Sequence, residues 1–124
     1  MIYLDTHVVV WLYQKSRNEF SSETLILIDE EELLISPMVE LELEYLFEID
    51  RINTRSQIIL EYLKERIGLK ICDKPFQVVI KKALSMKWTR DPFDRIITAQ
   101  AAVDNSMLVT KDKRIQKHYP EAVW

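Results

Sequence analysis

Four short apolar segments alternate with longer amphipathic segments along this chain of 124 residues. The apolar segments predict buried strands at residues 2–4, 33–35, 69–72 and 107–109, with residues 122–124 as a candidate fifth strand. The segments between them predict helices at residues 6–13, 22–31, 37–50, 56–67, 75–86 and 92–105. Short apolar strands separated by helices are typical of a parallel sheet covered by helices. We therefore expect an α/β sandwich with a mainly parallel sheet of four or five strands.

Length and composition predict one globular domain over residues 1–124. The chain is 48% hydrophobic and 30% charged, and no apolar run approaches the roughly 20 residues that a membrane span needs. No leader-like segment precedes Asp5, so the cytoplasm is the expected location. Cys72 is the only cysteine, which excludes an internal disulfide and a multi-cysteine metal site, and we expect it to be buried.

Gly68 is the only glycine, and we expect it to end the helix over residues 56–67. Loops that cradle phosphate groups need several positions where the backbone can approach a ligand closely, and glycine provides them. The sequence therefore excludes nucleotide sites of the Walker and Rossmann kinds.

Charge is divided unevenly along the chain, although the net charge is only −3. Residues 1–73 hold 7 Lys/Arg against 15 Asp/Glu, whereas residues 74–117 hold 10 against 4. Cations that share one face can bind nucleic acid even in a net acidic protein, and the alternative of equal weight is a set of solvated helix faces. The candidates for contacts to nucleic acid are Arg90, Arg95, Lys111, Lys113 and Arg114.

Asp5 and Asp112 each follow a predicted strand. In parallel sheets, ligands bind where the loops leave the carboxyl ends of the strands, so both side chains are expected at that edge. Taken singly, either aspartate is better explained as the N-cap of the helix that follows it. The case for a functional site depends on several acids meeting there.

Glu42 lies on a different helix face from the other glutamates of residues 37–50. Glu40, Glu44 and Glu48 recur every four residues and share a solvated face. Glu42 is about 200° from Glu40 around the helix, on a stripe that we expect to face the core, with Met38, Tyr45, Leu46 and Ile49. An inward glutamate is costly unless it is paired or binds a metal, so we favour a functional role over a structural ion pair.

The segment Asp91-Pro92-Phe93-Asp94 has the composition of a helix start, with aspartate as N-cap and proline at the first helical position. Capping accounts for Asp91. Asp94 instead begins a stripe that we expect to face the sheet, which continues through Ile97, Thr98 and Ala101.

Several carboxylates at one edge would repel one another by about 4 kcal/mol per pair at about 4 Å in an effective dielectric of about 20. A cation relieves this repulsion, and sites made only of oxygen ligands suit Mg²⁺ or Mn²⁺. Such ions promote hydrolysis of phosphodiesters without a covalent nucleophile from the protein. His7 and His118 are then not required, and we interpret both as surface or packing residues.

The order of these motifs resembles the PIN-domain ribonucleases, and within them the VapC toxins of toxin–antitoxin pairs. The matching segments span nearly the whole chain: Leu4-Asp5-Thr6-His7 with Trp11-Leu12, Ile35-Ser36 with Glu42 and Arg51-Ile52, Arg90-Asp91-Pro92-Phe93-Asp94-Arg95 with Ala99-Gln100-Ala101, and Leu108-Val109-Thr110-Lys111-Asp112. No single segment is specific, but together they are.

The resemblance implies that the family's acidic quartet consists of Asp5, Glu42, Asp94 and Asp112, which would bind Mg²⁺ or Mn²⁺ and catalyse cleavage of RNA. By the same resemblance, Thr6 and Thr110 are polar supports and Asp91 is a second acid typical of the subgroup. It also implies a three-layer α/β/α fold, a homodimer, and inhibition by a VapB-like antitoxin. This chain departs from the pattern at Asp50, where relatives often carry glycine, and at Leu41, where an aromatic residue is common.

Other readings of the sequence remain as alternatives. A phosphoacceptor receiver domain has a similar size, but it normally has an acidic pair after its first strand, where Leu4-Asp5-Thr6 has one acid. A haloacid-dehalogenase-type phosphatase needs aspartates two residues apart, and His7 occupies the second place. The closer alternatives are a PIN nuclease that processes RNA without being a toxin, and a PIN fold kept as a binding module.

Overall fold

The computed structural model describes residues 1–124 as five strands, seven α-helices and one 3₁₀ helix. In chain order the elements are β1 (Ile2–Leu4), α1 (Thr6–Tyr13), η1 (Arg17–Glu19), α2 (Ser22–Glu30), β2 (Leu33–Ile35), α3 (Pro37–Glu48), α4 (Ser56–Ile67), β3 (Lys70–Ile71), α5 (Phe76–Ala83), α6 (Pro92–Ala102), β4 (Met107–Val109), α7 (Lys113–His118) and β5 (Ala122–Val123). No helix combines the length and the apolar character that a membrane span needs.

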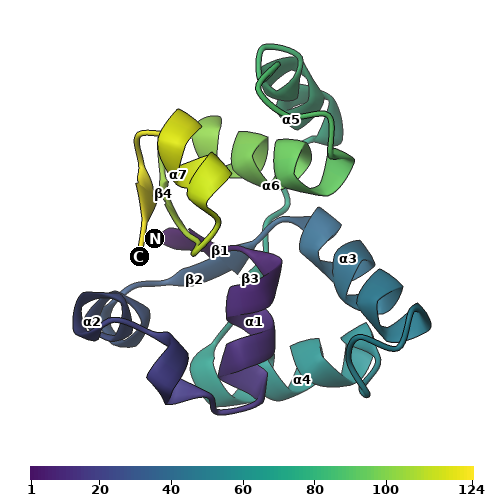
Figure 1. Cartoon of the computed structure of the whole chain (residues 1–124), viewed down its shortest axis with the longest axis vertical. Coiled ribbons are helices and arrows are strands. Elements are labelled where there is room, and N and C mark those ends of the chain that lie inside the picture. The colour runs from purple at the N-terminus through teal and green to yellow at the C-terminus, as the bar shows by residue number, and fades with distance from the viewer.

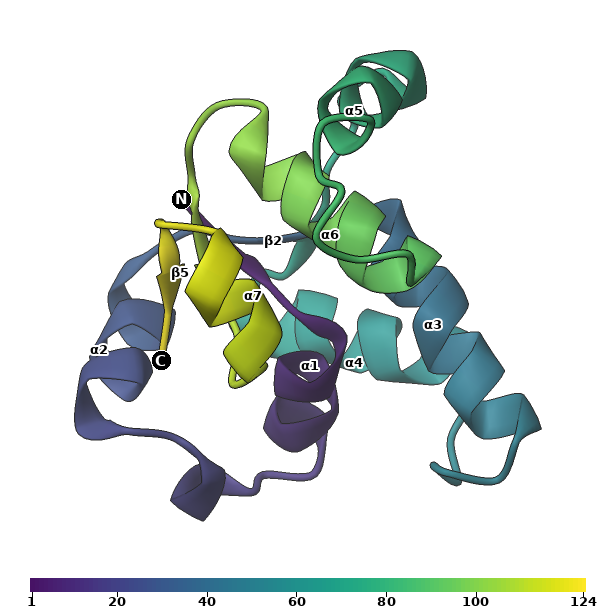
Figure 2. The same cartoon turned by 45° about the horizontal axis from the view of Figure 1, so that its top comes forward.

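The five strands form one sheet in the order β3-β2-β1-β4-β5, and every neighbouring pair is parallel. Helices α1, α2 and α4 lie on one face, whereas α6 and α7 lie on the other (Figure 1). Helices α3 and α5 extend away from the sheet on either side of α6 (Figure 2). The expected α/β/α sandwich is confirmed.

The central strand β1 is buried on both faces, because Ile2, Tyr3 and Leu4 are each at most 1% exposed. The neighbouring strands β2 and β4 also belong to this apolar core. Helix residues such as Val8 and Ile97 pack against the sheet from its two faces. Strands buried on both faces read as continuous apolar runs, which is why the sequence identifies them.

Local capping signals fix where several helices begin and end. Ser36 accepts a hydrogen bond from the backbone N–H of Met38 at the start of α3, and Ser21 does the same for Thr24 in α2. At the end of α4, Gly68 adopts the left-handed conformation with φ of 70°. Asp50, just after α3, is also left-handed with φ of 61°, where the family pattern has glycine.

The structure corrects three expectations about elements. The third strand contains only Lys70 and Ile71, both exposed, between buried Leu69 and buried Cys72. Helix α5 ends at Ala83 instead of Met86, and helix α6 ends at Ala102 instead of Asn105. The 3₁₀ helix η1 was not predicted, whereas helix α7 is the helix expected after Asp112.

The stripe of α3 that contains Glu42 faces the core only at Met38, and the rest of it does not, contrary to expectation. The core side chains of α3 are Val39 and Leu43, whereas Tyr45 and Ile49 are 45% and 43% exposed. The stripe lies toward α6, where the Tyr45 ring is 5.7 Å from the ring of Phe93. Glu42 is therefore half-buried at the edge of the packed region.

Candidate active site

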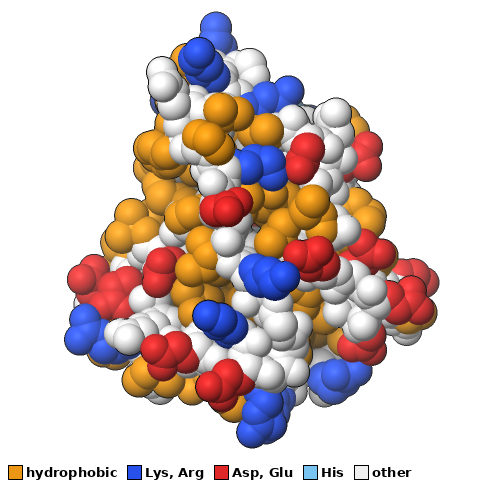
Figure 3. All heavy atoms as spheres, turned by 180° about the vertical axis from the view of Figure 1, so that it is seen from behind, with side chains coloured by type: hydrophobic (Ala, Val, Ile, Leu, Met, Phe, Trp, Pro, Cys, Tyr) orange, Lys and Arg blue, Asp and Glu red, His pale blue; other side chains and the backbone are white.

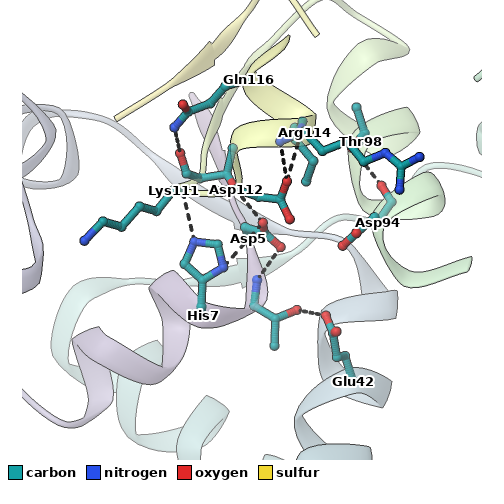
Figure 4. A network of polar contacts seen from close by, with 12 residues as sticks. Asp5, His7, Glu42, Asp94, Thr98, Lys111, Asp112, Arg114 and Gln116 are labelled. Carbon is teal, nitrogen blue, oxygen red and sulfur yellow. Dashed lines mark hydrogen bonds and ion pairs between the residues drawn. The ribbon is translucent and has the colours of Figure 1, made fainter. Parts of the chain in front are cut away.

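The pairing of β1 with β4 brings two acidic loops together. Leu4 pairs with Val109, and the backbone N–H of Asp5 donates to the Val109 carbonyl at 3.1 Å. Asp5 and Thr110 therefore leave neighbouring strands side by side. Figure 4 shows that the carboxylates of Asp5, Glu42, Asp94 and Asp112 face one common space.

Asp5 is 3% exposed and both of its carboxylate oxygens accept hydrogen bonds. Oδ1 accepts from the backbone N–H of Thr6 at 2.8 Å, in the manner of a helix N-cap. Oδ2 accepts from the hydroxyl of Thr110 at 2.6 Å. The side chain thus caps α1 and has a fixed orientation at the sheet edge.

Two threonines connect Asp5 to the carboxylate of Glu42 and to the backbone of Asp112. Thr6 binds Asp5 through its N–H, and its hydroxyl donates to Oε1 of Glu42 at 2.5 Å. Thr110 binds Asp5 through its hydroxyl, which also accepts from the backbone N–H of Asp112 at 3.0 Å. A continuous chain of hydrogen bonds therefore joins three of the four acids.

Asp112 is the N-cap of α7. Its Oδ1 accepts from the backbone N–H groups of Arg114 and Ile115, at 2.8 and 3.0 Å. Gln116 binds the carbonyl of Thr110 at 2.8 Å and fixes the loop before the helix. The capping role and a place at the site are compatible, because only one carboxylate oxygen is occupied by the cap.

Asp91 and Asp94 are used differently at the start of α6. Oδ1 of the exposed Asp91 accepts from the N–H groups of Phe93 and Asp94, at 2.8 and 3.2 Å, as expected for an N-cap. The Asp94 carboxylate makes no hydrogen bond, although the Asp94 carbonyl accepts one from the hydroxyl of Thr98 at 2.7 Å. The carboxylate points toward Asp5 and Asp112 (Figure 4).

Burial and mutual repulsion raise two pKa values in this cluster. Burial is the main reason why the pKa of Asp94 is raised to about 7. The negative charges of the neighbouring acids raise this pKa further, namely those of Asp91, Asp5, Asp112 and Glu42. The pKa of Glu42 is also raised, mainly by burial, against the opposing hydrogen bond from Thr6. Glu42, Asp94 and Asp112 form no ion pair with any lysine or arginine.

The donor set fits a hard divalent cation. All four side chains offer oxygen ligands. No lysine or arginine pairs with their negative charges, which together with burial raise the pKa of Asp94. No three His, Cys, Asp or Glu side chains are grouped so that they could hold one ion by themselves. This arrangement suits Mg²⁺ and Mn²⁺, since Mg²⁺ typically takes one or two carboxylates and completes its shell with water and substrate phosphate.

His7 contacts the site, which the sequence analysis missed. Its Nε2 accepts a hydrogen bond from the backbone N–H of Lys111 at 2.9 Å, and its Nδ1 is 3.6 Å from Oδ2 of Asp5. The ring also packs edge-on against Trp11, which agrees with the packing role expected of it. The only sequence signal was its position two residues after Asp5. His118 stacks on Trp88 with ring centroids 5.2 Å apart.

Of the cations proposed for nucleic-acid contacts, some already bind other groups of the protein and others do not. Arg95 donates to the carbonyls of Ala83 and Leu84 at the end of α5, so its guanidinium already has a structural role. Lys111 lies over Trp11 and is 3.7 Å from a carboxylate oxygen of Glu19. The others are exposed and form no ion pair, namely Arg90, Lys113 and Arg114.

The surface seen from behind carries cations around the end formed by α5, and cations alternate with carboxylates over the rest of that face (Figure 3). This face does not form one continuous basic surface. A role of the basic half of the chain in binding nucleic acid therefore stays a prediction, centred on the exposed cations near Asp112.

This chain is similar to known proteins over nearly its whole length. The family model described as PIN domain matches residues 2–121. "Ribonuclease VapC22" of Mycobacterium tuberculosis is 28% identical over 128 residues, which cover 99% of this chain and 98% of that protein.

Two solved structures share the fold. One is VapBC2 from Rickettsia felis bound to a DNA fragment from their promoter, with a TM-score of 0.67 and 21% identity over 99% of this chain and 96% of that one. The other is a toxin–antitoxin complex from Klebsiella pneumoniae, with a TM-score of 0.67 and 14% identity over 100% of this chain and 97% of that one.

Proposed function

This chain belongs to the PIN-domain family, and on that premise we propose that it is an endoribonuclease that requires Mg²⁺ or Mn²⁺ and serves as the toxin of a VapBC-type pair. The observation that carries the proposal is the cluster of four acids, Asp5, Glu42, Asp94 and Asp112. Thr6 and Thr110 join three of these residues by hydrogen bonds. None of the four carboxylates pairs with a lysine or an arginine. A structural cluster of this kind would be expected to include a cationic partner.

The four carboxylates are the residues that would hold the divalent ion. Bound there, such an ion supplies Lewis-acid activation of a phosphodiester, with no covalent nucleophile from the protein. Thr110 and the N–H of Thr6 orient the Asp5 carboxylate, and the hydroxyl of Thr6 orients that of Glu42. Since no three of these side chains are grouped to hold one ion, an ion would use one or two carboxylates directly and complete its shell with water and substrate phosphate.

The remaining groups at this edge would act on the RNA. Lys113 and Arg114 follow Asp112 directly and are exposed, so they are placed to contact phosphates next to the acidic cluster. Arg90 precedes the cap of α6 on the opposite side of the site and is also exposed. Contacts of this kind position a strand without reading its sequence.

The pairing with an antitoxin is supported by the relatives. The two solved structures are toxin–antitoxin assemblies that match nearly this whole chain, and the Mycobacterium tuberculosis relative is called a ribonuclease. We infer that a VapB-like antitoxin binds this protein and inhibits it in the cytoplasm. An RNA-processing PIN nuclease without an antitoxin is the alternative, and a receiver-like signalling module is a more distant one.

The test is cleavage of RNA by the purified chain with Mg²⁺ or Mn²⁺, with excess EDTA, and with the variant Asp94→Asn. We expect cleavage only when the ion and Asp94 are both present. Undiminished cleavage in EDTA would refute the metal requirement. Co-expression with the product of an adjoining short reading frame separates the two biological roles, because a toxin should stop growth alone and not with its antitoxin.

A further inference from the structure

His7 connects the two loops that carry Asp5 and Asp112. It follows Asp5 on the first turn of α1, and its ring reaches across the sheet edge to the loop after β4. One ring nitrogen accepts from the backbone N–H of Lys111 at 2.9 Å, and the other lies 3.6 Å from Oδ2 of Asp5. Each ring nitrogen thus faces a different loop of the site (Figure 4).

The contact with Lys111 fixes the chemical form of the imidazole. A backbone N–H can only donate, so Nε2 must be the nitrogen without a proton. In a neutral imidazole the proton then sits on Nδ1, which faces the carboxylate of Asp5. The N–H that remains is therefore directed at one of the carboxylates that we assign to metal binding.

We propose that His7 is a positioning residue that holds Asp5 and the segment Thr110–Asp112 in register for metal binding. The inference rests on the proposed function, since Asp5 and Asp112 belong to the quartet proposed there. Partners of this kind keep a ligand oriented before the ion arrives, and their loss typically weakens metal affinity by about 10- to 100-fold.

Packing alone does not account for this arrangement. The ring contacts Trp11 edge-on at 4.9 Å between centroids, a contact that a phenyl ring could also make. A phenyl ring could not accept from Lys111 or donate toward Asp5. The side chain is 32% exposed, so its removal from the hydrogen-bond network leaves no large cavity.

The two functions of the ring can be separated by substitution. His7→Phe keeps the aromatic contact and removes both polar ones. His7→Gln places an amide oxygen near the position of Nε2, where it can accept from Lys111 again. His118→Phe is the matched control, because His118 stacks on Trp88 and contacts none of the four acids.

Two measurements on these variants, and a third on the parent, test the proposal without any turnover. Calorimetric titration with Mn²⁺ alone should show affinity about 10- to 100-fold weaker for His7→Phe, partly restored in His7→Gln and unchanged in His118→Phe. Hydrogen exchange of the Lys111 amide in metal-free protein should be fast in His7→Phe and slow in the parent and in His7→Gln. Nitrogen NMR of the parent should show the proton on Nδ1.

The opposing results are equally specific. If His7→Phe binds Mn²⁺ within twofold of the parent and still protects the Lys111 amide, His7 positions nothing. If His7→Gln and His7→Phe lose affinity equally and both melt early, its role is structural and the proposal is overturned. If the parent itself binds no Mn²⁺, the proposed function fails, and the Lys111 exchange still decides whether His7 joins the two loops.

Discussion

Asp91 and Asp94, at the start of α6, need different properties of their side chains. Asp91 is exposed and uses one oxygen to cap the helix, so its side chain needs only an acceptor. The Asp94 carboxylate is half-buried among four other acids and receives no hydrogen bond. The same substitution, aspartate to asparagine, should therefore have different consequences at the two positions.

Asp91→Asn should leave both stability and cleavage nearly unchanged, because asparagine caps helices about as well as aspartate. Asp94→Asn removes an anionic ligand while nearly preserving shape, so it should abolish cleavage. The metal-free fold should become more stable by about 1 kcal/mol, after solvent screening of the repulsion is allowed for. Thermal midpoints in EDTA and Mg²⁺-dependent cleavage, measured for both variants, check this. Near-normal cleavage by Asp94→Asn would mean that the quartet has been assigned to the wrong aspartate.

The raised pKa of Asp94 also predicts how stability varies with pH in metal-free protein. Below its ordinary pKa of 3.8 the group is protonated in both states and has no effect. Between 3.8 and about 7 the unfolded chain releases the proton and the folded chain retains it. Stability should therefore fall as pH rises through this window and level off above about 7.

Thermal midpoints of the parent and of Asp94→Asn, recorded from pH 3.5 to 8 in EDTA, test this dependence. The variant lacks the titrating group, so the difference between its thermal midpoint and that of the parent should increase as pH rises. A difference of about 1 kcal/mol in the free energy of unfolding corresponds to about 3–5 °C in the midpoint. Curves that stay parallel over the whole range would show that Asp94 is not the group responsible.

At the level of elements, helix starts were predictable because their signals are local. Serine and aspartate caps stand next to the helices that they begin, so Ser21, Ser36 and Asp91 located α2, α3 and α6 within a residue. The end of α5 was not predictable, because the carbonyls of Ala83 and Leu84 bind Arg95 from α6. That contact joins distant parts of the chain and has no sequence signal.

The same distinction applies to the candidate site. Asp5 and Asp112 follow strands that the hydrophobic pattern located, so their place at one edge could be argued from the sequence. Asp94 and Glu42 lie within helices, and the family resemblance implied their place in the quartet. The bond from Lys111 to His7 depends on the register of β1 against β4. The orientation of the Glu42 stripe depends on how α3 packs against α6. Neither is encoded in the periodicity of one helix.

Two of the left-handed residues that follow helices, Asp50 and Gly68, predict opposite effects on stability. Gly68 has φ of 70° and no atom within 4 Å of a Cβ built there, so Gly68→Ala adds backbone strain without a clash and should cost about 1 kcal/mol. Asp50 has φ of 61°, and Asp50→Gly relieves strain while increasing the freedom of the unfolded chain. We expect a gain of about 0.5 kcal/mol or less. Urea denaturation of both variants measures this, and an unchanged Gly68→Ala would contradict the conformational argument.

The whole molecule exposes apolar side chains on the two helices that flank α6. Tyr45 on α3 and Ile49 just after it are exposed by 45% and 43%, and Phe76 at the start of α5 and Leu84 just after its end are exposed by 63% and 62%. Both helices pack against α6 and extend beyond the sheet (Figure 2). Large apolar side chains exposed on neighbouring helices are typical of surfaces that bind another protein.

We expect this surface to form the homodimer that the family resemblance implies, so that light scattering should give twice the 14.8 kDa of one chain. The double variant Tyr45→Glu with Leu84→Glu places charge in the interface and should be monomeric, because desolvating unpaired carboxylates opposes association. Its fold should persist, since both side chains are exposed in the single chain. Ile26→Glu on α2 is the matched control, because Ile26 is 54% exposed and α2 lies on the opposite face of the sheet from α6, so this variant should remain dimeric. A monomeric parent, or dissociation caused equally by Ile26→Glu, would place the association elsewhere or remove it altogether.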